Sequence, residues 1–251
     1  MNTGGDERVL VLIPTFNEAE NIELIVARTR VAHPELDILV IEDNSPDGTG
    51  AIVDRLVAQD PRVHVVHRLV KDGIGAAYIA GFMWGLAQGF TVFIEMDADG
   101  SHQPEEIDRL LGAIGSAHIV QGSRWVSGGA VVNWPRHRLL LSRAGSLYAR
   151  FALGIAIRDS TGGFRAYRRE ALESINLDTV SSKGYCFQID MIRRALFEDL
   201  TVVEVPITFI EREFGTSKMS TRIVAEAMWR VTVWGAQRAF MRSRSALSQS
   251  H

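Results

Sequence analysis

Two carboxylates, Asp97 and Asp99, are the residues best suited to chemistry, because they follow the short, largely apolar run at residues 91–96. Such a run predicts a strand buried on both faces, so the two acids lie at its carboxyl end. Ligands of open α/β sheets bind at that end, and carboxylates at i and i+2 can share one hard divalent cation. One interpretation is a metal that holds a diphosphate. The other is a plain turn, in which Asp99 or Ser101 caps a helix beginning near Pro104.

Two earlier apolar runs, at residues 9–13 and 36–41, end in the same way. The polar, turn-rich segments 14–18 and 42–49 follow them. Three such strand ends could contact the base, the ribose and the diphosphate of a nucleotide-sugar donor. The glycine-rich segment 73–77 opens a helix, but it lacks the third glycine of a dinucleotide-binding fingerprint, and the sequence has no P-loop lysine motif. We interpret this segment as a tight turn.

The elements that must position these residues alternate between strand and helix. A first helix is expected after the run at 9–13, with Thr15 or Asn17 as its N-cap. Alternation of this kind predicts an α/β fold with a mostly parallel sheet. The other expected elements are helices at 51–59, 75–88 and 185–196, a strand at 63–66, a return to the sheet at 161–167 and a strand at 201–210.

Length and composition are those of an ordinary soluble chain. With 251 residues, 46% of them apolar, it can form one large domain or one domain with a subdomain. The single cysteine, Cys186, is typical of a reducing compartment, and the N-terminus lacks the pattern of a secretory signal. No stretch reaches the roughly 18 to 20 apolar residues of a spanning helix. We therefore expect a cytoplasmic protein that lies on a membrane if it works at one.

The net charge of −3 conceals a strong asymmetry along the chain. Residues 1–123 contain 8 Lys and Arg against 19 Asp and Glu, whereas residues 124–169 contain 9 Arg and a single acid, Asp159. The second block predicts an anionic partner, although solvated arginines on an ordinary helix would give the same count. Its arginines are interleaved with aliphatic rather than aromatic residues, which argues against nucleic acid.

Residues 135–154 predict an amphipathic helix in which Arg136, Arg143 and Arg150 recur every seven residues. This helix can rest in a membrane interface with its arginines at lipid phosphates, or it can be a buried connector. Residues 126–134, just before it, predict a flexible loop that closes over the site once donor and metal are bound.

The last third of the chain contains two further features. Residues 211–220 predict a mobile polar loop with Gly215 as a hinge candidate, or simply a solvated loop. Residues 221–240 predict an amphipathic helix that docks on a bilayer, on a membrane partner or on its own domain. A small, polar tail follows.

Five segments together carry a resemblance to a known family. They are 14–18 (PTFNE), 42–49 (EDNSPDGT), 97–99 (DAD), 121–124 (QGSR) and 159–165 (DSTGGFR). The combination resembles the inverting family-2 glycosyltransferases of GT-A fold, and more narrowly the dolichyl- and polyprenyl-phosphate mannosyltransferases, including polyprenol monophosphomannose synthases. The likeness runs from residue 9 to residue 238, and it rests on the combination because each motif alone is weak.

The resemblance implies a GT-A (Rossmann-like) α/β fold: a mixed, mostly parallel sheet flanked by helices, with amphipathic interfacial helices and no transmembrane span. It implies one domain at 9–240, divided into a nucleotide-sugar-binding half (9–123) and an acceptor- or lipid-facing half (124–240). A disordered N-terminus (1–8) and a flexible tail (241–251) flank this domain.

The implied reaction is transfer of mannose from GDP-mannose to a polyprenyl (dolichyl-type) monophosphate, with inversion and with Mg²⁺ or Mn²⁺ as cofactor. The enzyme would be peripheral on the cytoplasmic face of a membrane, with a possible separate membrane-anchoring subunit, and it would serve lipoglycan and glycoprotein biosynthesis. Two alternatives stay open. One is a glucosyltransferase that uses UDP-glucose, and the other is a non-catalytic nucleotide-sugar sensor.

Motif matching assigns the site residues. The donor would contact Pro14, Phe16, Glu18, Asp43, Asp97, Ala98, Asp99, Arg212 and Lys218. The acceptor phosphate would contact Arg124, Arg136, Arg138 and Arg212. The metal would be held by Asp97 and Asp99, which are the catalytic residues together with Arg124.

Two positions depart from the family pattern. Phe16 replaces a common tyrosine, so it can stack but lacks a hydroxyl donor, and Glu42 replaces a usual aspartate. Ser101 and His102 are open as further metal ligands. The acceptor phosphate has a second pKa near about 6 and needs no general base, so Asp159 would orient an arginine or turn the chain.

Overall fold

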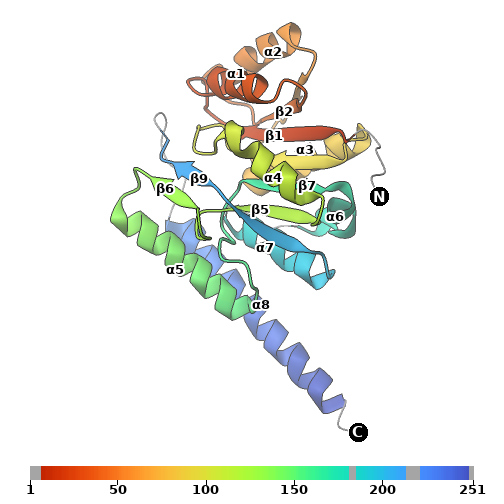
Figure 1. Ribbon diagram of the computed structural model, residues 1–251, viewed down its shortest axis with the longest axis vertical. Coiled ribbons are helices and arrows are strands. Elements are labelled where there is room, and N and C mark those ends of the chain that lie inside the picture. Colours follow the sequence, from red (N-terminus) through yellow and green to blue (C-terminus); the bar gives the residue numbers. More distant parts are fainter. Residues whose placement is uncertain (1–6, 181–184, 213–220, 249–251) are drawn as a thin grey trace.

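The computed structural model describes residues 7–180, 185–212 and 221–248. Within them, the chain is built around a seven-stranded mixed sheet (Figure 1). β7 runs antiparallel to both of its neighbours, and all other neighbouring strands are parallel. The predicted fold class is thus confirmed. Across the sheet the strands are β3 (Val63–His67), β2 (Asp37–Glu42), β1 (Val9–Thr15), β4 (Val92–Glu95), β7 (Arg165–Arg168), β5 (Ile119–Ser123) and β8 (Val202–Pro206).

Side chains of the central strands alternate between two cores on opposite faces of the sheet. In β1, Val11 and Ile13 belong to one core, and Leu10 and Leu12 to the other. Burial on both faces is why these strands show no polar alternation in sequence. The first core is covered by α1 (Ile22–Ala32), α2 (Thr49–Gln59) and α4 (Ile107–Ile114), and the second by α3 (Ile74–Ala87), α6 (Arg169–Ser174) and α7 (Tyr185–Phe197). Short 3₁₀ turns are η1 (Pro104–Glu106) and η2 (Leu177–Thr179).

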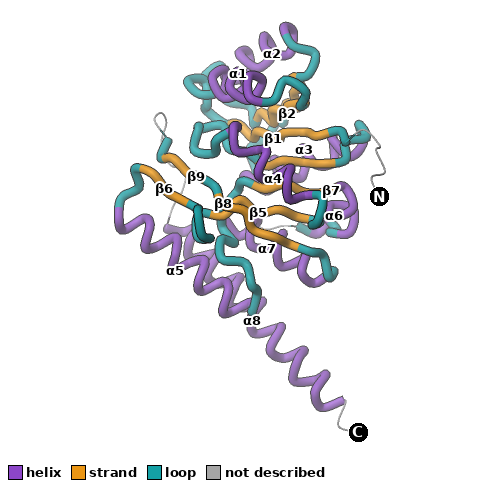
Figure 2. Tube along the Cα trace, viewed as in Figure 1, coloured by secondary structure: helices purple, strands orange, loops and turns teal. Residues whose placement is uncertain are grey.

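A second, two-stranded sheet corrects two predictions. β6 (Ala130–Val132) pairs in parallel with β9 (Thr208–Ile210), next to α5 (Arg136–Leu153) (Figure 2). The expected single strand at 201–210 is therefore wrong. Pro206 ends β8, and the Ile207 carbonyl accepts from the Ala130 N–H at 2.9 Å, so the chain moves to a new partner. The loop expected at 126–134 contains β6.

The start of α1 corrects a third prediction. Neither Thr15 nor Asn17 caps this helix, because Thr15 belongs to β1 and Asn17 lies in the following loop with a left-handed φ of 55°. The helix begins at Ile22 instead, with Asn21 in the N-cap position. The Glu18 carbonyl accepts hydrogen bonds from the Asn21 N–H at 3.0 Å and from the Ile22 N–H at 2.9 Å. The loop between β1 and α1 therefore lies outside the helix, at the end of β1 where the predicted donor residues are found.

Helices α5 and α8 (Thr221–Ser248) lie side by side, and α8 continues past the rest of the protein (Figure 1). Ala149, Leu153 and Val231 pack with Ile189 of α7 in a third small core. The helix runs through Ser248, within the segment expected to be a flexible tail. Residues 1–6 of the expected disordered N-terminus lie outside the described part of the chain. No described helix is both long and apolar enough to cross a membrane.

Candidate active site

The carboxyl ends of β2, β1 and β4 lie next to one another, so the loops that follow them share one edge of the sheet. Thr15 is the register partner of Glu42, and Leu12 is the partner of Glu95. The Met96 N–H continues the ladder to the Leu12 carbonyl at 3.0 Å. The acidic pair predicted from the sequence therefore begins beside the end of β1.

The two loops of the predicted donor site are bonded to each other. Backbone N–H groups of residues 17–19 donate to side chains of the second loop: Asn17 to Ser45 Oγ at 3.1 Å, Glu18 to Thr49 Oγ1 at 3.0 Å and Ala19 to Asp47 Oδ2 at 3.1 Å. These bonds hold the loop of Phe16 and Glu18 against the loop of Asp43. The predicted donor residues at the first two strand ends are thus brought together.

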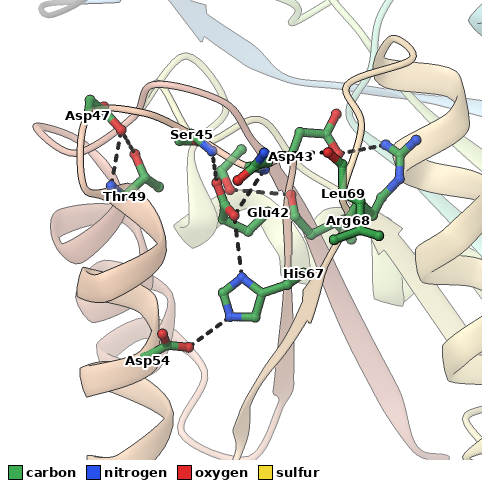
Figure 3. A network of polar contacts seen from close by, with 12 residues as sticks. Glu42, Asp43, Ser45, Asp47, Thr49, Asp54, His67, Arg68 and Leu69 are labelled. Atoms are coloured by element: carbon green, nitrogen blue, oxygen red, sulfur yellow. Dashed lines mark hydrogen bonds and ion pairs between the residues drawn. The ribbon is translucent and has the colours of Figure 1, made fainter.

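Glu42 anchors the second of these loops (Figure 3). Its buried carboxylate accepts from the N–H groups of Asn44 at 3.1 Å and Ser45 at 2.6 Å, and from His67 Nδ1 at 3.3 Å. Burial opposes ionisation, but these bonds hold the pKa of Glu42 below its usual value. The other ring nitrogen of His67 bonds to Asp54 at 2.8 Å, and this bond raises the pKa of His67.

Asp43 and Phe16 each face a basic residue. Arg68 Nη1 donates to the buried Asp43 carboxylate at 2.6 Å, and burial nevertheless raises the pKa of Asp43. The Lys71 ammonium lies 3.4 Å from the centre of the Phe16 ring, a cation–π contact. The predicted donor site is therefore lined by two cations, Arg68 and Lys71, that the sequence analysis did not identify.

Asp97 and Asp99 are held by different neighbours. The Asp97 N–H donates to His102 Nδ1 at 3.0 Å, so this nitrogen of His102 is not available to a metal. Asp99 accepts from the Ser101 N–H at 3.1 Å and pairs with Arg212 Nη2 at 2.8 Å. Burial raises the pKa of Asp97, and the neighbouring Asp99 carboxylate raises it further.

These oxygens suit a hard divalent cation. The two carboxylates lie in one turn, and the buried Ser101 Oγ has no hydrogen-bond partner among the described residues. In the described part of the chain, no group of three or more His, Cys, Asp and Glu side chains is arranged so that it could hold a metal ion. A cation here would thus need oxygens from a ligand or water as well. A cavity of about 140 Å³ borders Asp99 and Glu211, which is too small for a whole nucleotide sugar.

A buried polar layer lies beneath the acidic pair. Glu95 is the register partner of Arg165, and both are fully buried. The Arg165 guanidinium donates to the carbonyls of Gln188 at 2.7 Å and Ser160 at 3.0 Å. Burial raises the pKa of Glu95 to about 8, against the pull of Arg165. Arg165 therefore connects β7 to the loop of Ser160 and to α7.

Arg124 and Asp159 form a buried, two-pronged ion pair. Arg124 Nε and Nη2 each lie 2.7 Å from an Asp159 oxygen, and the Arg124 N–H donates to the same carboxylate at 2.9 Å. Burial opposes the charge of Asp159, yet the guanidinium keeps its pKa below the usual value. The interpretation of Asp159 as the residue that orients Arg124 agrees with this geometry.

The other predicted acceptor residues lie in different surroundings. Arg138 Nη1 donates to both carboxylate oxygens of Glu211 at 2.5 Å, whereas Arg136 is exposed at the start of α5. Arg212 faces Asp99 rather than the arginine block. Lys218 lies outside the described residues. No local pattern in the sequence indicates Glu211 or the network of His67, because their partners lie far along the chain.

A mostly parallel sheet that brings two polar loops and an acidic pair to one edge is the architecture of a GT-A fold. The chain belongs to the family described as "Glycosyl transferase family 2", whose model matches residues 10–175.

Two curated relatives match nearly the whole chain. It is 56% identical over 243 residues to polyprenol monophosphomannose synthase of Mycolicibacterium smegmatis, covering 96% of this chain and 92% of the relative. It is 57% identical over 228 residues to undecaprenyl-phosphate mannosyltransferase of Micrococcus luteus, and the match covers 91% of this chain and 94% of the relative.

Solved structures support the fold. The complex of Mycobacterium tuberculosis glucosyl-3-phosphoglycerate synthase with Mn²⁺, UDP and glucosyl-3-phosphoglycerate has a TM-score of 0.64 at 19% identity. The match covers 90% of this chain and 77% of the other. At this identity the likeness shows the architecture alone.

Proposed function

We propose that the protein transfers mannose from GDP-mannose to a polyprenyl monophosphate, with inversion, giving polyprenyl-phosphate mannose and GDP. The observation that carries the proposal is the identity of 56% and 57% to two enzymes named for mannosyl transfer to polyprenyl carriers, across more than nine-tenths of the chain. The division of charge supports it, because an acidic pair for a metal–diphosphate stands apart from an arginine-rich block for a phosphate.

On the donor side, the chain's own residues bind and orient. The loops of Phe16 and Asp43 would contact the guanosine part, while Asp97 and Asp99 would hold Mg²⁺ or Mn²⁺ with Ala98 beside the diphosphate. When bound, the divalent cation supplies charge compensation for the departing diphosphate. Arg212 already lies at Asp99, where its guanidinium can add to that compensation.

On the acceptor side, the nucleophile needs no proton removed. The phosphate monoester is largely dianionic at neutral pH, because its second pKa is about 6. Arg124, fixed by Asp159, offers a preorganised cation. Asp159 serves as a positioning residue, because both of its oxygens are occupied by Arg124.

We also propose that the enzyme works as a peripheral protein at the cytoplasmic face of a membrane, alone or with a membrane-anchoring partner. Four apolar side chains of α5 are exposed to solvent in the described protein: Leu140, Leu141, Leu147 and Phe151. Arg136, Arg143 and Arg150 on the same helix can meet lipid phosphates. A buried single cysteine suits a reducing compartment.

The first experiment is transfer of labelled sugar from GDP-mannose, with UDP-glucose in parallel, to a short polyprenyl phosphate, with Mn²⁺ and with chelator. We expect chelator-sensitive formation of prenyl-phosphate mannose. Asp99→Asn should lower the rate by about a hundredfold, whereas Asp108→Asn, at an exposed carboxylate of α4, should not change it. If sugar is transferred only from UDP-glucose, the donor is UDP-glucose and not GDP-mannose. If a donor binds but no sugar is transferred from either, the protein is a non-catalytic nucleotide-sugar sensor.

A further inference from the structure

The imidazole ring of His102 is fixed by aromatic side chains of two different sheets. His102 is almost completely buried, with 1% of its surface exposed. Its ring stacks on Phe164, with 5.0 Å between the ring centroids and 13° between the ring planes, and it meets Phe209 edge-on at 5.5 Å. Phe164 directly precedes β7 of the large sheet, and Phe209 lies in β9 of the small one. Close packing from both sides leaves the ring little freedom to rotate.

This fixed ring bonds to the main chain of Asp97. The ladder between β4 and β1 ends with the Met96 N–H, which donates to the Leu12 carbonyl at 3.0 Å. The next N–H group along the chain, that of Asp97, donates to His102 Nδ1 at 3.0 Å. A side chain thus continues to hold the backbone at the point where the sheet stops.

The same bond fixes the position of the proton on the ring. A ring nitrogen that accepts a hydrogen bond carries no proton, so the neutral imidazole of His102 bears its proton on Nε2. A nitrogen must be deprotonated to coordinate a metal, and Nδ1 is already occupied by the Asp97 N–H. His102 is therefore not a metal ligand in this arrangement.

The carboxylate of Asp97 stays open while its backbone is held. His102 Nδ1 lies 3.9 Å from Asp97 Oδ2, which is beyond hydrogen-bond distance. The Asp97 side chain is 32% exposed, whereas that of Asp99 is 7% exposed and pairs with Arg212. His102 thus anchors Asp97 without using the oxygens that a cation would need.

The 159–165 segment completes this support. It supplies Phe164, which stacks on His102, and it places Gly163 beside both His102 and Asp97. A Cβ built at Gly163 would lie 3.6 Å from His102 Cε1 and 3.9 Å from Asp97 Oδ1. A glycine at this position therefore keeps side-chain atoms out of the space beside the Asp97 carboxylate.

We infer that His102 is a positioning residue for the divalent cation: through Nδ1 it holds the backbone of Asp97, so that the Asp97 carboxylate is in place before the cation binds. The inference rests on the proposed function in one respect, that Asp97 and Asp99 hold this cation. Hydrogen-bonded groups behind metal ligands orient them, and losing such a group typically costs about 10- to 100-fold in metal affinity. His102 would act on the cation only through Asp97.

The test is titration of the full chain with Mn²⁺ in the presence of GDP, followed by electron paramagnetic resonance, which requires no sugar transfer. His102→Phe keeps a stacked ring but removes the acceptor, and it should weaken Mn²⁺ binding about tenfold. His102→Asn loses the ring, but its Oδ1 can take the place of Nδ1, so it should bind Mn²⁺ within about twofold of the native protein. A residue that only fills space predicts the reverse order, because phenylalanine replaces the volume of the ring and asparagine does not. His64→Phe, at a histidine of β3 that bonds to Asp37, should leave Mn²⁺ affinity unchanged.

A second measurement uses the native protein, so it decides the matter even if His102→Phe does not fold. Nuclear magnetic resonance of ¹⁵N-labelled histidine, with the His102 signal assigned by its loss in His102→Asn, should show a bare Nδ1 and a protonated Nε2 at neutral pH. A proton on Nδ1 would overturn the inference, and so would native Mn²⁺ affinity in His102→Phe.

The outcomes separate this inference from the proposed function. Native protein that follows the expected order of Mn²⁺ affinities but transfers no mannose would refute the proposed function and leave the role of His102 standing. Mannose transfer by a native protein whose Mn²⁺ affinity does not depend on His102 would do the opposite. Native protein that binds no Mn²⁺ with GDP would overturn both.

Discussion

At the scale of single residues, the site is held in place by charges that are already paired. Arg212 neutralises Asp99, Arg68 neutralises Asp43 and Arg124 neutralises Asp159. A ligand that binds one of these six side chains must therefore replace a protein contact. Replacing a protein ion pair with a ligand contact reduces the net affinity. The same ion pair, however, holds the charged side chain in position before the ligand binds, as electrostatic preorganisation requires.

The Glu42–His67–Asp54 chain predicts a dependence of stability on pH. Hydrogen bonds to Asp54 and Glu42 raise the pKa of His67 above its usual 6.5. Protonated His67 therefore stabilises the folded protein fully below pH 6.5, and this stabilisation is lost as pH rises through the raised pKa of His67. Urea unfolding of native protein and His67→Gln should differ most at pH 6 and converge at higher pH. A constant difference from pH 6 to 9 would contradict this titration.

Asp159 predicts a large loss of stability when its charge is removed. Asp159→Asn leaves the buried Arg124 guanidinium without a counter-charge, at a cost of about 3–5 kcal/mol in the free energy of unfolding. Because the pKa of Asp159 is lowered, this advantage of the native protein is present above pH 3.8 and is lost as pH falls through the lowered pKa. Urea titration measures it.

A control separates positioning from catalysis. The double substitution Arg124→Met with Asp159→Leu removes both charges and should recover most of the stability, yet not the acceptor affinity. Equal stability of Asp159→Asn and the native protein would contradict the role of Asp159 as the counter-charge of Arg124.

Residue identities could be predicted from the sequence, but their partners could not. Asp97, Asp99 and Asp43 follow apolar runs, and local order alone indicates their place at strand ends. The pairing of Arg138 with Glu211 joins positions 73 residues apart, and Arg68 with Asp43 joins different strand ends. No local pattern encodes such pairs, because they depend on how the strands are ordered across the sheet.

At the scale of elements, burial decides which predictions succeed. β1, β2 and β4 are buried along almost their whole length, and their continuous apolar runs in the sequence predict bounds close to the observed ones. β6 and β9 have only three residues each and are mostly half-buried, so they leave no periodic signal. These two short strands nevertheless bring Glu211 to α5 and Arg212 to Asp99.

Close packing of α3 on the sheet predicts a cost for one methyl group. A Cβ at Gly85 would lie 2.6 Å from a Phe93 ring atom and 2.7 Å from a Leu10 methyl carbon. Both neighbours are fully buried, so Gly85→Ala should destabilise the protein by about 1–3 kcal/mol, although alanine favours helices. Denaturant unfolding provides the measurement.

Gly112→Ala in α4 is the matched control for Gly85→Ala. Its added Cβ would meet no atom within 4 Å, so helix propensity should act alone and stabilise slightly. Equal stability changes for the two glycines would show that α3 can shift away from the sheet.

At the scale of the whole molecule, the proposed donor and acceptor sides lie at different halves of the sheet. The strands β2, β1 and β4 carry the loops proposed for the donor, and α5 with α8 stands beyond the opposite half of the sheet (Figure 1). The exposed apolar residues of α5 begin only a few residues after Arg138. On the proposed function, a lipid phosphate that enters from a membrane along this helix would meet Arg138 before the acidic pair.

This arrangement predicts that membrane binding and catalysis can be separated. Leu147 and Phe151 are 51% and 76% exposed, so Leu147→Ser with Phe151→Ser should leave the free energy of unfolding nearly unchanged. Sedimentation with anionic vesicles should show about tenfold weaker binding, because two large apolar side chains no longer insert. Val31→Ser, at an 85% exposed position of α1, should bind vesicles like the native protein. Transfer to a short, water-soluble prenyl phosphate should persist in all three proteins, while transfer to a long-chain acceptor in vesicles falls only in the α5 variant. Unchanged sedimentation of that variant would place the membrane contact elsewhere, because α5 would then be exposed without serving the bilayer.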